Sequence, residues 1–277
     1  MRAARAKEAH VVRGSVAAIA VMLAVLPLFW VIRLAFLPSN EFVGVPPAFR
    51  GGFTLDNFSQ AINDGGILTG IKNSFIIVSV GSVGATVLAA IGGYALAKLP
   101  VPGRRLWLAL IAVTIAVPLP AIMIPLFDAG LKLGYTDSVP GLMVVYVGIF
   151  SAWGTYFMFS YYRGLPDALL ESARVDGSGD VGTFCRIALP LSLPALGVVL
   201  MFNFFIQWSE LILALILLPD ASRQTVMVKV ALYGGEFDAG GPAQAAGFLI
   251  AALPVFVVFA LGQRFLRGGI FGGAIKA

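Results

Sequence analysis

The side chains in this sequence best suited to bind a polar solute lie close together within an apolar stretch. They are Asn203, Gln207, Trp208, Ser209 and Glu210. Amides and carboxylates hydrogen-bond hydroxyl groups, and an indole face stacks on the apolar side of a sugar ring. A carboxylate in an apolar span is costly, and by default it indicates function. We therefore expect Gln207 or Glu210 to face a solute pathway, helped by the ring of Trp208.

The same side chains also have a purely structural interpretation. Asn203 and Gln207 lie one helical turn apart, so they are also suited to holding neighbouring helices together by hydrogen bonds. In this alternative Glu210 lies near the outer end of its helix and meets water or Arg223. Both interpretations stay open, and Tyr156 and Thr114 are secondary pathway candidates.

The longest run of mixed polarity, residues 165–194, lies between two apolar segments and is predicted to be a sizeable loop on one face of a membrane. Pro166 and Asp167 are typical of a helix start, and Gly177 is typical of a left-handed helix end. A second short helix is expected over about 179–187. Ser178 is its predicted cap and Leu189-Pro190 its predicted end.

Small residues occupy the middle of the first of these short helices. Ser172 and Ala173 allow another surface to approach the backbone, and Glu171 and Asp176 supply charge around them. A close-packing centre with a polar rim is typical of a docking surface. The alternative is a solvated connector between membrane helices.

The composition places most of the chain in a membrane. Of 277 residues, 59% are hydrophobic and 12% are charged, whereas soluble domains carry about 25% charged residues. The net charge of +5 does not indicate nucleic acid, because the basic residues are spread between apolar segments. One histidine and one cysteine exclude a His/Cys metal site and an internal disulfide. No GxxxxGK[ST] sequence occurs, so we expect no ATP site, no bound cofactor and no enzymatic activity on this chain.

The apolar runs predict an all-α, polytopic membrane protein with six transmembrane helices. The spans are expected at residues 14–36, 73–97, 106–127, 139–162, 191–218 and 243–261. The third span holds Pro118, Pro120 and Pro125, which leave carbonyls without partners. Such backbone is tolerated at membrane depth only inside protein or along a wet cavity, so this span is a candidate wall of a translocation path. Four glycines of the second span predict close helix approach: Gly81, Gly84, Gly92 and Gly93.

Lysine and arginine give the orientation. Six of the 19 lie on the side opposite the N-terminus: Arg33, Arg50, Lys72, Lys132, Arg223 and Lys229. The other thirteen lie on the side of the two termini and of the 165–194 loop. Because positive residues favour the cytoplasm, we expect both termini and this loop to be cytoplasmic.

Four segments of the sequence resemble one protein family, the permeases of ABC importers. Glu171-Ser172-Ala173, Gly177 and Ile187-Ala188-Leu189-Pro190 keep the spacing of the family's "EAA" loop, with Ser172 in place of the usual alanine. Leu55-Asp56-Asn57-Phe58 is similar to its T-x-x-N-Y/F segment. Trp208-Ser209-Glu210 is similar to its Trp-Asn-Asp/Glu position, with Ser209 where asparagine is usual. The glycine-rich tail is similar to the ending of the maltose-type second permease.

This resemblance implies the type I ABC importer permease fold, in the inner membrane of a bacterium. It implies a heterodimer with a second permease, two ATP-binding subunits that carry ATP and Mg, and an extracytoplasmic binding protein. Glu171, Ser172, Ala173, Asp176 and Gly177 would couple this chain to the ATP-binding subunits. The implied cargo is a sugar. The alternatives are glycerol phosphate, a polyol or an amino sugar in the same machinery, or an ion-driven transporter that works alone.

The expected organisation has three parts. Residues 1–72 hold the cytoplasmic N-terminus, the first span and an outer loop. Residues 73–264 form the transmembrane core with the 165–194 loop, and residues 265–277 form a cytoplasmic tail.

Overall fold

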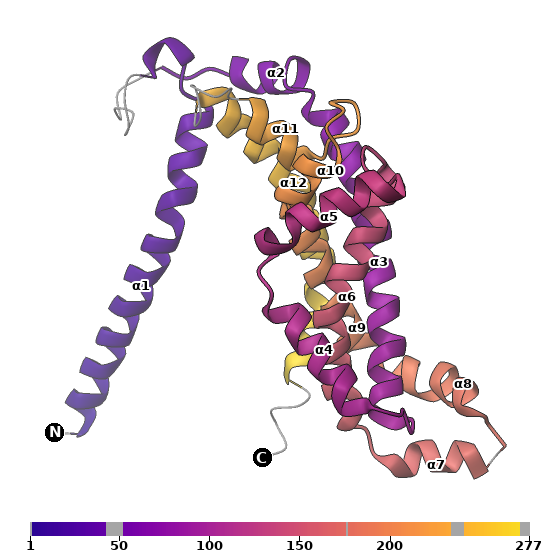
Figure 1. The fold of residues 1–277 in the computed structure, drawn as a ribbon. Coiled ribbons are helices and arrows are strands. Elements are labelled where there is room, and N and C mark those ends of the chain that lie inside the picture. The colour runs from indigo at the N-terminus through magenta and orange to yellow at the C-terminus, as the bar shows by residue number, and fades with distance from the viewer. Residues whose placement is uncertain (1, 43–51, 176, 234–240, 272–277) are drawn as a thin grey trace. The chain divides into compact units, whose positions relative to one another are not determined.

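The computed structural model describes residues 2–42, 52–175, 177–233 and 241–271, with side chains except at 2–12, 174 and 264–271. Every regular element in these ranges is a helix, which confirms the predicted all-α fold (Figure 1). The long helices are α1 (Arg2–Ala35), α3 (Ile67–Lys98), α6 (Val139–Arg163), α9 (Leu189–Ser209) and α12 (Pro242–Phe271). The shorter ones are α2 (Asp56–Asn63), α4 (Arg104–Ala116), α5 (Leu119–Leu133), α7 (Asp167–Val175), α8 (Asp180–Thr183), α10 (Ile212–Leu217), α11 (Val226–Tyr233) and a 3₁₀ turn at Ser39–Glu41.

Five helical stretches in the described part are long and apolar enough to cross a membrane, and α4 with α5 makes a sixth if the bent pair is one span. They begin at Arg13, Ile67, Val139, Asp180 and Pro242. The prediction of six spans therefore holds in number. The boundaries move, because α3 begins six residues before the expected start and α12 runs on into the expected tail. Residues 272–277 of that tail lie outside the described residues.

The third span is not the single helix predicted over 106–127. It breaks after Ala116, and α4 and α5 meet at 100°. Val117 is extended at ψ 121°, and Pro118 is extended at ψ 134°. A residue before proline is driven out of the α region, and proline itself has no N–H to donate. The pair Val117-Pro118 therefore ends one helix and begins another, whereas Pro125 is tolerated inside α5.

The fifth span also differs from the prediction. It starts within the loop, because α8 continues through a π-helical turn (Phe184–Ala188) into α9. Leu189-Pro190 therefore does not end the second short helix as predicted. The Leu189 N–H donates to Phe184 O in the five-residue spacing of a π turn. At its C-terminal end the span stops at Ser209, and α10 follows as a separate helix rather than a continuation to residue 218.

The chain forms two compact units, residues 1–67 with 230–252, and residues 68–229 with 253–277. In the first unit, Asn57 is buried and its amide donates to Ala35 O and Leu37 O, each at 2.8 Å. These carbonyls lie at the C-terminal end of α1, where four carbonyls lack helical partners. Asn57, the asparagine of the T-x-x-N-F segment, therefore fixes α2 to the end of α1.

Glycines of α3 bring its backbone close to α6 in the second unit, as predicted. A Cβ at Gly93 would lie 2.6 Å from Met158 Cβ and 2.8 Å from the Phe159 backbone nitrogen. A Cβ at Gly84 would lie 2.6 Å from Val147. Lipid tails are as apolar as the side chains between helices, so association depends on close packing rather than on the hydrophobic effect. These contacts show that the backbones of α3 and α6 pack closely along this stretch.

We expect Gly93→Ala to lower the free energy of unfolding by about 1–3 kcal/mol, because its methyl group meets backbone that cannot move aside. The matched control is Gly148→Ala on α6, where a Cβ would have nothing within 4 Å. That control should be neutral or gain up to about 1 kcal/mol from helix propensity. Apparent melting temperatures in nanodiscs measure both. Equal stability of the two variants would contradict the close α3–α6 contact.

Candidate functional site

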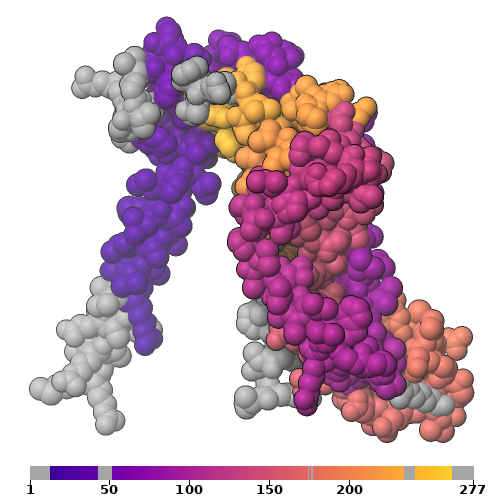
Figure 2. All heavy atoms as spheres, in the orientation of Figure 1, coloured from indigo at the N-terminus to yellow at the C-terminus, as the bar shows by residue number. Residues whose placement is uncertain are grey.

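The 165–194 loop holds α7 and α8, which lie at one end of α3 and α6, at the lower right of Figures 1 and 2. Leu170 and Ala173 are buried, at 3% and 6% exposure, whereas Glu171 and Ser172 are exposed. Residues three apart share a helix face, so Leu170 and Ala173 fix α7 to the bundle while the opposite side stays open. Within this chain, Ser172 presents the small side chain outward and Ala173 does not. A docking role for Ala173 stays a prediction.

Gly177 ends α7 as predicted. Its φ is +81°, and the Ser178 N–H donates to Ala173 O at 2.9 Å, which is the six-residue closure of a Schellman motif. No atom lies within 4 Å of where a Cβ would be. Glycine is therefore required here by backbone conformation rather than by space. Asp176, the fifth residue of the predicted coupling set, lies outside the described residues.

Two exposed valines flank this turn, and the sequence analysis did not select them. Val175 is 87% exposed and Val181 is 77% exposed, and Leu169 on α7 is 46% exposed. Apolar side chains in a polar loop mark an interaction surface more clearly than those facing lipid. The signal was present in the sequence, as apolar residues in the one long run of mixed polarity.

The prediction that Ser178 caps α8 was wrong, because Gly179 occupies the N-cap position without a side-chain hydrogen bond.

The pathway candidates of the fifth span are buried inside this chain. Asn203 is 1% exposed and its amide donates to Thr86 Oγ1 of α3 at 3.3 Å, as expected of a residue that joins two helices. Gln207 is also 1% exposed, beside Gly81 of α3, where a Cβ would collide with its Oε1. Neither amide atom of Gln207 has a hydrogen-bond partner among the described residues. Joining two helices therefore accounts for Asn203 but not for Gln207.

Glu210 closes the break between α9 and α10. Its backbone is extended at ψ 127°, and its side chain is 8% exposed. Oε1 accepts the Leu213 N–H at 2.8 Å, and Oε2 accepts the Ala214 N–H at 3.1 Å and the Tyr146 hydroxyl at 2.8 Å. Leu211 occupies the N-cap position of α10, so the Glu210 carboxylate caps the helix from one residue earlier by accepting two of its first free N–H groups. Its charge complements the helix dipole. Glu210 thus begins α10 and connects it to α6.

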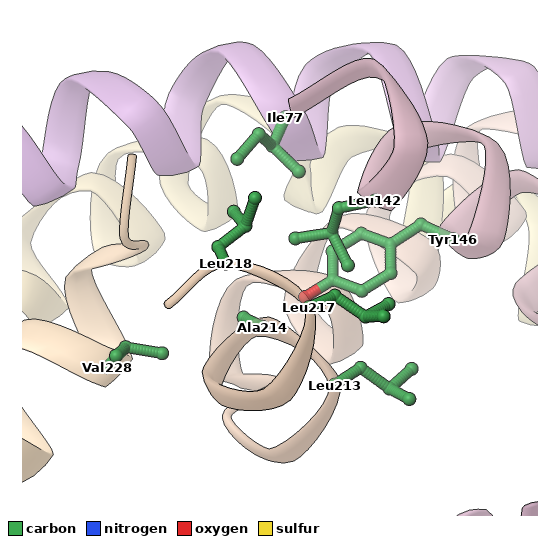
Figure 3. Close-up of a cluster of buried hydrophobic side chains, with 8 residues drawn as sticks. All are labelled: Ile77, Leu142, Tyr146, Leu213, Ala214, Leu217, Leu218 and Val228. Atoms are coloured by element: carbon green, nitrogen blue, oxygen red, sulfur yellow. The ribbon is translucent and has the colours of Figure 1, made fainter. Parts of the chain in front are cut away.

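Tyr146, which bonds Glu210, belongs to a buried apolar cluster. Figure 3 shows the side chains of this cluster. The cluster joins α3, α6, α10 and α11 through Ile77, Leu142, Tyr146, Leu213, Ala214, Leu217, Leu218 and Val228.

The alternative in which Glu210 meets Arg223 is not what the structure shows. Arg223 instead bonds the carboxylate of Asp137 at 2.9 Å, and Asp220 lies 3.7 Å from its Nε. The Ser222 backbone N–H and hydroxyl lower the pKa of Asp220 below its usual value.

The remaining pathway candidates differ in exposure. Trp208 is 2% exposed and stacks on Phe204, with ring centroids 5.4 Å apart. Tyr156 is 49% exposed on α6. Thr114 is exposed on α4, and its hydroxyl donates to Leu110 O of the same helix. The described residues contain no group of three His, Cys, Asp or Glu side chains that could hold a metal ion.

Residues 85–268 match the sequence profile of the binding-protein-dependent transport system inner membrane components. The chain belongs to this family. The matched range runs from the middle of α3 through the loop that holds α7 and α8 and into α12.

Named relatives of this transport component cover most of its length. It is 27% identical to the diacetylchitobiose uptake system permease NgcG of Streptomyces coelicolor, over 92% of this chain and 85% of that protein. It is 33% identical to the alpha-glucoside transport system permease AglG of Rhizobium meliloti, over 81% of this chain and 60% of that protein. A crystal structure of a bacterial ABC transporter involved in the import of alginate has a chain with the same fold. The TM-score is 0.73 at 20% identity, covering 92% of this chain and 95% of the other.

In this transport component, we expect Glu210→Ala to lower the free energy of unfolding by about 2–3 kcal/mol. The variant removes a helix cap and leaves the Tyr146 hydroxyl buried without its acceptor. Glu210→Gln keeps a carbonyl acceptor of the same shape and should cost about half as much. Ser209→Ala is the neighbouring control, since this exposed hydroxyl bonds only carbonyls of its own helix. Thermal melting in nanodiscs compares the three, and an unchanged Glu210→Ala variant would refute the capping role.

Proposed function

We propose that this chain is one permease subunit of a bacterial ABC importer for a carbohydrate. With a second permease it forms the translocation pathway. Two separate ATP-binding subunits carry ATP and Mg and drive transport, and an extracytoplasmic binding protein delivers the cargo. Both termini and α7 lie in the cytoplasm, in keeping with the distribution of lysine and arginine.

The observation that carries the proposal is the exposed side of α7. Glu171 and Ser172 lie on a short helix that is fixed to the bundle on one side by Leu170 and Ala173 and is closed by the turn at Gly177. Two apolar side chains, Val175 and Val181, extend beside it. An exposed short helix with an apolar and polar surface is suited to receive a partner, and its rigid seat is suited to pass a displacement to the spanning helices.

The cargo class is supported by the relatives, whose names specify diacetylchitobiose and alpha-glucoside transport. A pathway between two permeases must be lined by side chains that are exposed in each chain alone. Tyr156 meets this requirement at 49% exposure, whereas Trp208 and Glu210 are buried. We therefore propose Tyr156 as a pathway residue, and Gln207 as a residue that contacts the pathway only in another conformation. For Asn203, which joins α9 to α3, and for Glu210, which caps α10 and bonds Tyr146, we propose structural roles.

The test of this function is uptake by the assembled complex. The chain is purified with its co-purifying subunits and binding protein, placed in liposomes, and supplied with labelled maltose or diacetylchitobiose. We expect uptake only with MgATP and the binding protein, with glycerol 3-phosphate and polyols as weaker competitors. Uptake by this chain alone, driven by a proton or sodium gradient, would instead establish the ion-driven alternative.

A separate prediction concerns the turn that ends α7. Gly177→Val forces a β-branched residue into left-handed backbone at a cost of about 1–2 kcal/mol, so α7 should lose its fixed end and uptake should fall several-fold. Gly179→Val is the matched control. It also has open space around its would-be Cβ, but its φ of −69° suits any residue. Uptake is compared at equal membrane insertion and subunit assembly. If Gly177→Val transports as well as Gly179→Val, the turn is not needed for coupling.

A further inference from the structure

The cytoplasmic end of α3 is joined to the start of α7 by one side chain. Lys98, the last residue of α3, donates from Nζ to Asp167 Oδ1 at 2.6 Å and to Leu165 O at 2.8 Å. Asp167 is in the first turn of α7, and Leu165 is in the short linker that precedes it. These two contacts, here called the Lys98 bridge, connect segments 67 and 69 residues apart in the chain.

The environment of this lysine is unusual for a residue at a helix end. Its side chain is 8% exposed, whereas that of Asp167 is 74% exposed. Lysine is rarely buried unless it is paired, because its charge loses hydration. An ammonium group has three donors, and two of them are used here by one carboxylate and one carbonyl. Because the ammonium group of Lys98 is shielded from water, it depends on these two acceptors more than an exposed ion pair depends on its partner.

The structure contains a second lysine–aspartate pair that shows the contrast. Lys132 lies 2.6 Å from Asp128, but both residues belong to α5 and their side chains are 71% and 59% exposed. Such a pair within one exposed helix adds little stability and connects no second element. The Lys98 bridge has the same length, but it joins two helices that are not neighbours in the chain.

The helices α6 and α8 are the chain neighbours of α7, so a movement of α7 reaches them through short stretches of backbone. By contrast, α3 is separated from α7 by three helices, so a movement reaches it directly only through side-chain contacts. Leu170 of α7 shares a buried cluster with Tyr94 of α3 and with Tyr162 of α6. Apolar contacts of this kind allow sliding, whereas an ion pair with a second hydrogen bond fixes both distance and direction. Beyond this point α3 is packed closely on α6 through Gly93. A displacement that enters α3 at Lys98 would therefore move α3 and α6 together.

We propose that Lys98 is a positioning residue that makes α7 and α3 move as one body when the ATP-binding subunits act on α7. This rests on the proposed function, because it assumes that α7 is the segment on which they act. Without the bridge, α7 follows its partner while α3 lags behind, and ATP is hydrolysed with less cargo moved. The bridge therefore determines how efficiently nucleotide hydrolysis is converted into transport, rather than whether the complex assembles.

The experiment compares Lys98→Met with Lys132→Met in the full complex in nanodiscs and liposomes. Spin labels at Val87→Cys on α3 and Ala168→Cys on α7 report the distance between the two helices. The native Cys185, which is exposed, is replaced by serine throughout. Distances are recorded without nucleotide and with MgATP and vanadate. Uptake of labelled maltose or diacetylchitobiose per ATP hydrolysed is measured on the same preparations.

In the parent complex and in Lys132→Met, we expect one α3–α7 distance that is the same in both nucleotide states. Lys98→Met should give a broader distribution that shifts with nucleotide, and uptake per ATP should fall about fivefold or more at unchanged basal hydrolysis. Asp167→Asn keeps the bond to Leu165 O and should show a smaller loss of the same kind.

Unchanged distances and an unchanged uptake-to-hydrolysis ratio in Lys98→Met would overturn the proposal, as would an equal loss in Lys132→Met. If Lys98→Met fails to assemble, Asp167→Asn decides by the same two measurements. Failure of the proposed function has a different result, because the parent complex itself would then show no ATP-driven uptake.

Discussion

Backbone N–H and C=O groups at membrane depth need hydrogen-bond partners inside the protein, and this requirement shapes the break between α4 and α5 and the end of α9. At Glu210 the helix stops, and the carboxylate that follows accepts two N–H groups of the next helix and the hydroxyl of Tyr146. At Val117-Pro118 proline removes one donor, so the interruption needs fewer partners. The chain thus changes direction in an apolar environment without leaving many polar groups unpaired.

Close packing takes the place of hydrophobic burial in holding the spanning helices together. Gly93 lets α3 approach the backbone of α6, and Gly154 of α6 lies against Ala89 of α3 and Val199 of α9. Because these contacts leave little free space, the helices of the second unit are suited to move as bodies rather than to deform. Within this unit the Gln207 amide is buried, and neither of its polar atoms has a hydrogen-bond partner in the described part of the chain.

The 165–194 loop links these closely packed helices to the proposed mechanism of transport. Its helix α7 is seated on the bundle by Leu170 and Ala173, and its end is fixed by the left-handed turn at Gly177. On the other side, α8 runs through a π turn directly into α9, so the loop is continuous with a spanning helix. Coupling requires an element that two sites both displace, and we propose α7 as that element.

The sequence alone determined the features that depend on local chemistry. The number of spans follows from apolar runs of sufficient length. The end of α7 follows from Gly177, because only glycine enters left-handed backbone without cost. The likeness of residues 165–194 to the EAA loop indicates the family from residue types and spacing alone. In each case the determining residues lie within a few positions of one another, where spacing and side-chain type carry the information.

The tertiary structure decided which partner each polar group meets. Glu210 finds Tyr146 across 64 residues of sequence, and Lys98 finds Asp167 across 69. The outward face of α7 and the burial of Asn203 likewise depend on how helices distant in the chain pack together. Helical periodicity states which residues share a face, but it does not state which face meets protein, lipid or water. That choice is made by the packing of the whole bundle, since each helix must satisfy its neighbours at once.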